Sequence, residues 1–565
     1  MEFRSMIAEA IAEKTGLPAE EIAGLLETPP NPELGDFAFP CFRLAKTLRK
    51  APPLIAQELA ESVALPEGVG SAQPAGGYLN FTLDRSAQAR AVLSRIYAEG
   101  ARYGGSSEGA GRNVCIDYSS VNIAKPLHIG HLPSTVIGNA LYRICRHMGY
   151  HPVGINHLGD WGTQFGKMIC AYKAWGDRET IERGGVDELV KLYVRFHQEA
   201  EQDESLNEAA RGWFKKIEDR DPEATALFEW FKKITLEEVQ QVFDLMGIRF
   251  DSYAGESFYN DKMQPVIDEL REKGLLTKSQ GAEVVMLEDY GMPPALVLRS
   301  DGATLYITRD LAAAFYRHNT YHFDKCLYVV AYQQNLHFKQ LFKILELMGH
   351  DWYKGMEHVS FGMVSYEGRA LSTREGYVVY LEDLLNKAIE KAREIIEEKS
   401  PNLPNKDEVA RQVGVGAVVY FDLHNERIKD IDFRWERALS FEGETGPYVQ
   451  YTHARCCSVL RKAQAYADVE PDYSVLCDDE ALDVLMLISR FPEVVRKAMD
   501  QNEPSLITRH TTSLAQAYNK YYFEHRIMEE NDPAGSAARV NLTDAVRDVI
   551  KTGLYLIGVE APERM

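Results

Sequence analysis

The sequence lacks long apolar runs, and this absence narrows what the chain can be. No stretch approaches the roughly 18 consecutive apolar residues that a membrane-spanning helix needs. The start of the chain, from Met1 to Lys14, contains no apolar core of signal-peptide length. We therefore expect a cytoplasmic protein without a membrane partner.

Ordered cysteine patterns are also missing. The eight cysteines are scattered, no C-x-x-C pair occurs, and no histidine stands near them at zinc-finger spacing. We expect neither a disulfide framework nor a metal site, and specifically no zinc. The cysteines are Cys41, Cys115, Cys145, Cys170, Cys326, Cys456, Cys457 and Cys477.

Basic residues are fewer than acidic residues. The chain has 63 Lys and Arg against 84 Asp and Glu, which gives a formal net charge of −21. Such a charge repels a polyanionic partner such as nucleic acid. Local basic clusters weaken this objection, because salt screens charges beyond about 8 to 10 Å. These clusters are Arg43 to Lys50, Arg455 to Lys462 and Arg490 to Lys497.

What is present indicates a globular chain of several domains. The 565 residues are 45% hydrophobic and 26% charged, without a low-complexity tract, and such a length suggests about three or four domains. A first unit ends with the alternating stretch Gly77 to Leu83 and a glycine-serine run at 104–109. The succession of an apolar strand at Val114 to Tyr118, a helix at His131 to Met148 and a strand at His151 to Asn156 predicts a parallel α/β sheet.

The rest of the chain divides into an insertion, a return to the sheet and a helical third. Residues from about 175 to 250 have helical and acidic composition, as an insertion would. Strand character returns at Ala282 to Leu287 and at Ala295 to Leu298, and the apolar run Cys326 to Val330 restores the parallel sheet. After about Leu385 nearly all spacing is helical. We expect boundaries at 1–108, 109–385, 386–446 and 447–565.

The sharpest motif is His128-Ile129-Gly130-His131, which follows a strand at the point where the next helix begins. A helix N-terminus presents free N–H groups and the positive end of the dipole, and so favours a phosphate. Gly130 leaves room for a flat base against the backbone, and imidazoles donate to phosphate oxygens. Two surface histidines that cap a helix would give the same four letters, so the motif alone leaves both interpretations open.

A second stretch, Arg369 to Gly376, offers side chains that suit a triphosphate. Ser372, Thr373 and Arg374 could close on the phosphates, since charge on a transferring phosphate is best met by preorganised cationic donors. A solvated basic turn beside a glycine would have the same composition.

The residues around the first motif resemble the class I arginyl-tRNA synthetases. The string D-Y-S-S-V-N-I-A-K-P-L, from Asp117 to Leu127, leads into H-I-G-H, and further segments match in order along the whole chain. These segments are Asn156 to Gly166, Tyr306 to Asp310, Ser440 to Tyr448 and Ala561 to Met565.

The resemblance implies a fold and an activity. We expect an α/β protein with a Rossmann-type parallel-sheet catalytic domain, an N-terminal α+β domain, a helical connector at 386–446 and a C-terminal all-α helical-bundle domain that reads the anticodon. The implied enzyme uses ATP, with Mg²⁺, to activate L-arginine and joins it to tRNA(Arg). A monomer is expected.

The resemblance also implies the residues that bind ATP. His128, Gly130, His131 and Asn139 would contact the nucleotide. Ser372, Thr373 and Arg374 would belong to the degenerate counterpart of the K-M-S-K-S loop, whose second lysine is absent here. Lys125 would supply the missing charge.

Arginine selection has a physical logic. A guanidinium is a planar fork of donors that needs carboxylate or carbonyl acceptors, and lysine would leave part of such a set unmatched. The resemblance implies that Asp117, Asn122, Tyr306, Asp310 and Gln334 surround the amino acid. Asp310 could equally be the N-cap of a helix that begins at Leu311.

Two regions offer groups that RNA loops need, since loop bases are stacked on aromatic rings and bonded at their edges. The resemblance places Tyr78 and Asn80 at the D-loop, although an alternating strand would contain such residues anyway. Near the anticodon it places Tyr448, Gln450, Tyr451, His453, Arg455 and Met565. Tyr451 and Arg455 at i, i+4 could also be a packed helix face.

Two positions depart from the pattern of the family. Val121 stands where a proline usually precedes Asn122, and Pro133 stands where an arginine usually follows H-I-G-H-L. A first-turn proline is structurally tolerable, but the lost arginine removes a cation near the phosphate-binding end. A relative that binds tRNA or regulates, with weak or altered aminoacylation, is therefore the alternative.

Overall fold

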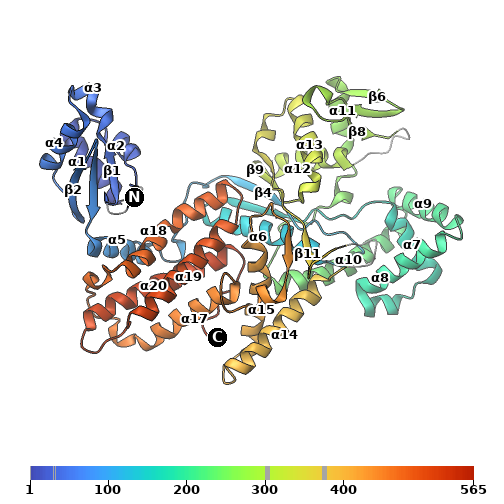
Figure 1. Cartoon of the computed structure of the whole chain (residues 1–565). Helices are drawn as coiled ribbons and strands as arrows, with labels where there is room; N and C mark the ends of the chain where they lie inside the picture. Colours follow the sequence, from blue (N-terminus) through green and yellow to red (C-terminus); the bar gives the residue numbers. More distant parts are fainter. Residues whose placement is uncertain (1, 30, 32–33, 300–305, 372–377) are drawn as a thin grey trace. The chain divides into compact units, whose positions relative to one another are not determined.

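The computed structural model describes residues 2–29, 31, 34–299, 306–371 and 378–565 (Figure 1). Its chain contacts divide it into two compact units. The first comprises Met1–Tyr103, Cys456–Arg490 and Ser513–Val549; the second comprises Gly104–Arg455, Phe491–Thr512 and Ile550–Met565. No helix within the described ranges is long and apolar enough to cross a bilayer.

The N-terminal part of the first unit is an antiparallel sheet covered by helices, as the expected α+β domain requires. The sheet has the order β1-β3-β2, with β3 in the centre. The core is formed by apolar side chains of both layers, among them Ile7, Phe39 and Phe81. The elements are α1 (Glu2–Thr15), α2 (Ala19–Leu25), β1 (Phe37–Pro40), α3 (Ala45–Leu48), α4 (Pro52–Ser62), β2 (Val69–Ala75), β3 (Tyr78–Leu83) and α5 (Arg85–Glu99).

The second unit is built on a parallel sheet of order β10-β9-β4-β5. Its strands are β4 (Asn113–Asp117), β5 (His151–Ile155), β9 (Phe323–Tyr328) and β10 (Met356–His358), and every neighbouring pair is parallel. Apolar residues such as Cys115 and Ile116 are fully buried, as a sheet covered on both faces requires. Helix α6 (Leu132–His147) connects β4 to β5, and Figure 1 shows it beside β4.

This strand order locates the site. From β4 the chain continues to β5 on one side, and β9 lies on the other, so the order reverses beside β4. Ligands of open parallel sheets bind at the carboxyl ends of the strands where the order reverses. The predicted motif His128–His131 follows β4, at this edge.

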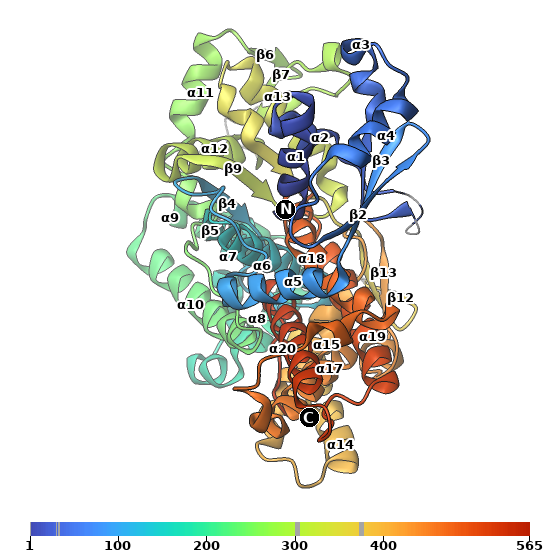
Figure 2. The same ribbon diagram turned by 90° about the vertical axis from the view of Figure 1, so that its left-hand side faces the viewer.

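A helical segment and a small sheet separate β5 from β9. The helices α7 (Thr163–Trp175), α8 (Arg178–Ala200), α9 (Ser205–Glu218) and α10 (Pro222–Leu245) come first, and α7, α8 and α9 lie side by side in Figures 1 and 2. Then follow α11 (Met263–Glu272) and the antiparallel strands β6 (Leu276–Ser279), β7 (Ala282–Val285) and β8 (Ala295–Leu298). Helices α12 (Tyr306–Tyr321) and α13 (Asn335–Leu347) flank β9 in sequence.

The last third is helical with one exception. Strand β13 (Ile431–Phe433) pairs in parallel with β11 (Val364–Tyr366), which also pairs with β12 (Arg369–Ala370). The expectation of helix is therefore wrong at β13, whose three residues are too few to show a strand period. The helices are α14 (Leu381–Lys399), α15 (Lys406–Leu423), α16 (Trp435–Ala438), α17 (Gly446–Lys462), α18 (Asp479–Asp500), α19 (Ser505–Glu524) and α20 (Pro533–Leu556).

Candidate active site at the carboxyl edge of the parallel sheet

The turn His128–His131 is held by its own hydrogen bonds. The Gly130 N–H donates to Nδ1 of His128 at 3.1 Å, and the His128 N–H donates to Nδ1 of His131 at 3.2 Å. The two ring centroids are 4.0 Å apart. Because Nδ1 of His128 accepts a hydrogen bond, its proton lies on Nε2. This leaves an N–H donor that can reach a phosphate oxygen.

Both rings are neutral near pH 7. Burial and the nearby Lys125 lower the pKa of His128. Burial, and after it His128 and Lys125, lower the pKa of His131 to about 3. Lys125 itself is exposed. The turn thus offers uncharged donors, and the positive charge beside them is the lysine.

Gly130 is required by the packing of the turn. A Cβ at this position would lie 2.8 Å from Cε1 and 2.9 Å from Nδ1 of His128. Such distances force the imidazole to move. The glycine therefore fixes the position of the His128 ring as well as keeping the turn open.

The predicted second phosphate-binding segment, Ser372, Thr373 and Arg374, lies outside the described residues. The chain on both sides of it contacts the first motif. Leu371 lies 3.6 Å from the position of a Cβ on Gly130, and the Ile129 N–H donates to the Val379 carbonyl at 2.9 Å. His128 also forms an antiparallel bridge with Tyr380.

The loop between β4 and this turn has an unusual backbone. Ser119, Ser120 and Ala124 have φ of 71°, 50° and 60°, a region that costs free energy for residues other than glycine. The Ser119 N–H donates to Oγ of Ser134, at 2.9 Å, in the first turn of α6. The Ala124 N–H donates to Oγ1 of Thr235 at 3.0 Å. These bonds hold the loop in its strained form.

Asp117, at the end of β4, is already engaged by protein donors. Nη2 of Arg317 lies 2.7 Å from its Oδ2, and both residues are almost fully buried, with 5% and 1% of their surfaces exposed. The Ser120 hydroxyl donates to Oδ1 at 3.1 Å. Arg317 lies in α12, about 200 residues away in sequence, and no motif indicated it.

Asp310 has a more open environment. It lies inside α12, which begins at Tyr306, so it is not an N-cap. Nε2 of His337 lies 2.6 Å from its Oδ2, and Nε2 of His157 lies 4.0 Å from its Oδ1. Its side chain is 28% exposed. Sequence reasoning missed both histidines.

Charge favours the ionised form of Asp310. Burial alone would raise its pKa, but the hydrogen bond from His337 and the proximity of His157 and Arg317 outweigh burial, and the pKa is lowered. Nδ1 of His157 also lies 3.3 Å from Nη2 of Arg317. Asp117 is paired with Arg317, whereas Oδ1 of Asp310 lies beyond hydrogen-bond distance of His157, which leaves it open to a cationic ligand.

The other residues predicted around the arginine are exposed. Tyr306 is 69% exposed, and Asn122 and Gln334 are also exposed. Gln334 ends a short turn three residues before His337. Asn122 and Gly159 form an isolated parallel β-bridge, which joins the motif segment 117–127 to the motif segment 156–166.

Asn139 does not join the phosphate-binding turn. It lies in α6 about 12 Å along the axis from His131, at 1.5 Å per residue. It is 6% exposed, and its Oδ1 accepts from Nε of Arg143 at 3.5 Å. A Cβ on Gly558 would lie 2.6 Å from its Nδ2. The contact of Asn139 with ATP stays a prediction.

The two departures from the family pattern have different surroundings. The Val121 N–H donates to Oδ1 of buried Asn156 at 3.2 Å, a bond that proline cannot make. Pro133 is buried in the first turn of α6 and lines a small cavity together with Asp422 and Arg427.

The residues predicted to contact the D-loop differ in accessibility. Tyr78 packs edge-on against Phe42, at 5.4 Å between ring centroids, and Phe42 is 52% exposed. Asn80 is only 5% exposed. The expected alternation fails here, because β3 buries three successive residues, Leu79, Asn80 and Phe81.

The residues predicted near the anticodon also differ in how exposed they are. Tyr451 is 43% exposed, and the Arg455 guanidinium lies 5.1 Å from its ring centroid. Gln450 and His453 are buried and bond to the carbonyls of Glu560 and Pro562, so they hold the C-terminal segment. Tyr448 is half-buried, and Met565 packs against apolar residues of α14 and α15.

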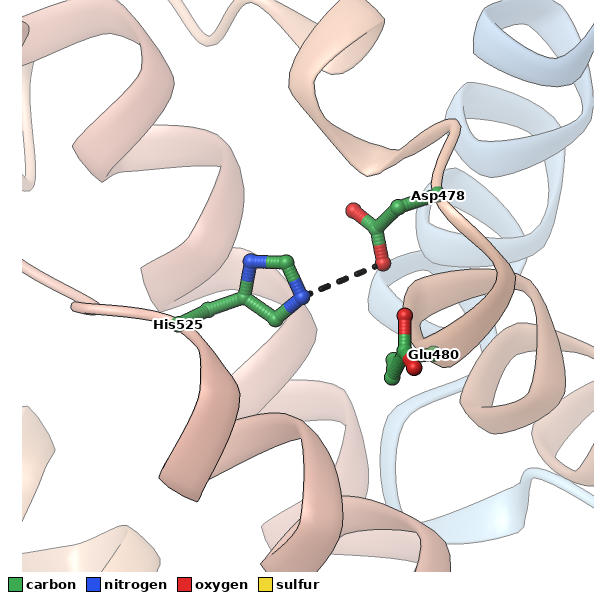
Figure 3. Close-up of side chains that lie close together, drawn as sticks. All are labelled: Asp478, Glu480 and His525. Carbon is green, nitrogen blue, oxygen red and sulfur yellow. Dashed lines mark ion pairs between the residues drawn. The ribbon is translucent and has the colours of Figure 1, made fainter.

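One group of potential metal ligands comes together within the described part of the chain. The ligand atoms of Asp478, Glu480 and His525 lie within 4.8 Å of one another (Figure 3). Asp478 already accepts from the Ala481 N–H at 2.8 Å and pairs with His525 at 3.3 Å. Glu480 pairs with Lys520 at 3.3 Å. Helix capping and ion pairing account for the group, and it supports no metal assignment.

Comparisons with known families cover nearly the whole chain. Residues 92–435 match the model of the class I (R) tRNA synthetase catalytic domain, residues 449–565 that of the DALR anticodon binding domain, and residues 1–83 that of the arginyl tRNA synthetase N terminal domain.

Individual proteins agree with these matches. The arginine–tRNA ligases of Alkaliphilus metalliredigens and Clostridioides difficile are each 53% identical over the full length of both chains. The solved structure of Thermus thermophilus arginyl-tRNA synthetase superimposes with a TM-score of 0.79 at 28% identity, with 100% of each chain covered. No finding supports the alternative of a tRNA-binding or regulatory relative.

Proposed function

This chain belongs to the class I arginyl-tRNA synthetases, and on that premise we propose which of its side chains bind ATP, which bind arginine and which contact tRNA. The enzyme activates L-arginine with ATP to arginyl-adenylate and transfers the arginine to tRNA(Arg), with release of pyrophosphate and AMP. The arginine carboxylate attacks the α-phosphorus, pyrophosphate leaves, and a terminal ribose hydroxyl captures the adenylate. Positioning and electrostatics carry most of such a reaction.

ATP is bound by neutral donors. We assign the Nε2–H of His128, the ring of His131 and the free N–H groups at the start of α6 to the phosphates, with Gly130 open to the nucleotide. Lys125 adds the positive charge. Ser372, Thr373 and Arg374 complete this set by family resemblance.

Mg²⁺ is proposed to arrive with ATP, bound to the phosphates. The ion prefers oxygen ligands in octahedral geometry. The described side chains of the turn are imidazoles and a lysine, which do not fit that preference. We therefore assign no protein ligand to it and route no step through it.

Arginine is assigned first to Asp310. Its carboxylate is ionised and partly exposed, and Oδ1 lies beyond hydrogen-bond distance of His157. Asp117 contributes to the negative potential, but Arg317 and Ser120 already occupy its oxygens. Asn122, Tyr306 and Gln334 are proposed to bind the remaining polar groups of the substrate.

The tRNA contacts are proposed from aromatic and cationic groups that are at least partly exposed. Tyr78 is the candidate at the D-loop, and Tyr448, Tyr451 and Arg455 are the candidates at the anticodon; Asn80 and Met565 are expected there by resemblance alone. A monomer and a cytoplasmic location also rest on family membership.

The Asp310 carboxylate is the observation that carries the arginine assignment. In tRNA(Arg)-dependent pyrophosphate exchange, we expect Asp310→Ala to raise the KM for arginine roughly 100-fold, as the loss of a buried partner of a cation does, with the KM for ATP within about twofold. Asp351→Ala is the control, because Asp351 is 89% exposed and, among the residues that the structure describes, forms its ion pair with Lys354. Equal changes in both KM values would refute the role of Asp310.

A further inference from the structure

His337 connects two elements of the proposed arginine site. It lies in the first turn of α13, and its Nε2 is 2.6 Å from Oδ2 of Asp310 in α12. Its side chain is 23% exposed. The ring packs edge-on against Phe338, at 5.4 Å between centroids, and Phe338 is buried in the core beside β9. The imidazole is therefore anchored on the protein side and directed at the carboxylate.

The two oxygens of Asp310 have unequal surroundings. Oδ2 is bonded to His337, while the nearest nitrogen to Oδ1 is Nε2 of His157 at 4.0 Å, too far for a hydrogen bond. Among the described residues, His337 is the one donor within hydrogen-bond distance of this carboxylate. Once one oxygen is fixed, the plane of the carboxylate and the direction of the other oxygen are fixed as well.

We propose that His337 is a positioning residue for arginine selection, which donates from Nε2 to Oδ2 of Asp310 and so leaves Oδ1 to the guanidinium of the substrate. This inference rests on the proposed role of Asp310. A guanidinium N–H donates well only to an acceptor with a defined lone-pair direction, and a freely rotating carboxylate loses much of this geometric selectivity.

The charge state of Asp310 gives the proposal a readout that a purely structural role would not move. Burial raises the pKa of Asp310, and the bond from His337 is the largest opposing cause. The other charged or titratable groups that act on it are His157, Arg317, Glu256 and Arg309. Without His337 the pKa of Asp310 rises, so its carboxylate becomes protonated at a higher pH than in the wild type.

The test is steady-state pyrophosphate exchange with tRNA(Arg) between pH 6 and pH 8.5. We expect His337→Ala to raise the KM for arginine roughly 10- to 100-fold, the effect of losing a hydrogen bond to a charged group, with the KM for ATP within about twofold. The increase is expected to be larger at pH 6 than at pH 8. His337→Gln, whose amide can donate from a similar position, should recover most of the affinity at pH 8.

The chain offers a matched control. Nε2 of His350 lies 2.7 Å from Oε1 of Glu269, with side-chain exposures of 24% and 26%, nearly the same pair away from the site. His350→Ala should leave both KM values unchanged. If His337→Ala changes the KM values no more than this control, or changes those for arginine and ATP equally, the proposal is overturned.

The roles of Asp310 and His337 can be refuted separately. If Asp310→Ala raises the KM for arginine and His337→Ala, folded by thermal melting, does not, the positioning role of His337 is wrong and the role of Asp310 stands. If Asp310→Ala has no effect, the assignment of Asp310 itself fails. In the double variant, a further loss beyond that of Asp310→Ala would show that His337 does not act through the carboxylate.

Discussion

At the scale of single residues, the neutral state of His128 and His131 decides what their rings would offer to the triphosphate that we propose they bind. A protonated imidazole would add charge but would break the acceptor role of Nδ1 in His128, which receives the Gly130 N–H. Burial keeps the pKa of both rings low, and for His131 it falls to about 3. The turn therefore keeps its geometry across the physiological pH range, and Lys125 supplies the charge.

Gly130→Ala tests this geometry. The new Cβ would lie 2.8 Å from Cε1 of His128 and displace the ring. We expect kcat for pyrophosphate exchange to fall roughly 100-fold, the cost of a misplacement of about 1 Å, with a smaller change in the KM for arginine.

The control for this variant is Gly212→Ala, since a Cβ at Gly212 meets nothing within 4 Å. It should retain full activity. Full activity in Gly130→Ala would show that the His128 ring is not positioned for the reaction.

At the scale of elements, the first turn of α6 meets the end of α15 around a small cavity. Pro133 and Asp422 line it, and its volume of about 10 Å³ is close to what one water molecule needs. Oδ2 of Asp422 is buried and has no hydrogen-bond partner among the residues that the structure describes. Burial raises the pKa of this carboxyl to about 7.

Asp422→Asn should change how stability depends on pH. The folded state holds the Asp422 proton up to about pH 7, whereas the unfolded chain releases it near 3.8. Its contribution to stability is therefore complete below about pH 4 and is lost as the pH rises to 7. We expect thermal melts of Asp422→Asn to match the wild type at pH 5 more closely than at pH 8, where the variant should be more stable by up to about 4 kcal/mol.

Other charged side chains face the same cavity, namely Glu426, Arg427, Lys429 and Glu503. They are unchanged in the variant, so they cancel in the comparison. The same pH slope in the wild type and in Asp422→Asn would contradict the burial of an unpaired carboxyl.

The elements that the sequence predicted are those with a clear pattern. The apolar strand, helix and strand from Val114 to Asn156 appear as β4, α6 and β5, and the run at Cys326 appears as β9. The residues that were missed pair across the fold. Arg317 meets Asp117 and His337 meets Asp310 only because the sheet and its helices bring them together, and no local spacing carries that information.

The surroundings of some predicted residues could also be understood only from the contacts in the structure. Val121 looked like a lost proline, yet its N–H bonds to Asn156 within the active-site loop. Asn80 was expected at the D-loop, yet its side chain is only 5% exposed. Both cases depend on neighbours that lie far away in the sequence.

At the scale of the whole molecule, the resemblance of scattered motifs was the strongest sequence signal, and the comparisons confirmed the family over the full chain. The net charge of −21 did not exclude a tRNA substrate. Phosphate contacts depend on local cations, and distant charges are screened by salt. The excess of acid residues is consistent with this function only if the tRNA meets local clusters of Lys and Arg.

The most direct test of the account is aminoacylation of tRNA(Arg) with each of the twenty amino acids in turn. The proposed pairing of an ionised Asp310 with a guanidinium predicts transfer of arginine and much slower transfer of lysine, because an ammonium leaves part of the acceptor set unmatched. Transfer of lysine at a rate comparable to arginine, or no transfer of arginine, would contradict it.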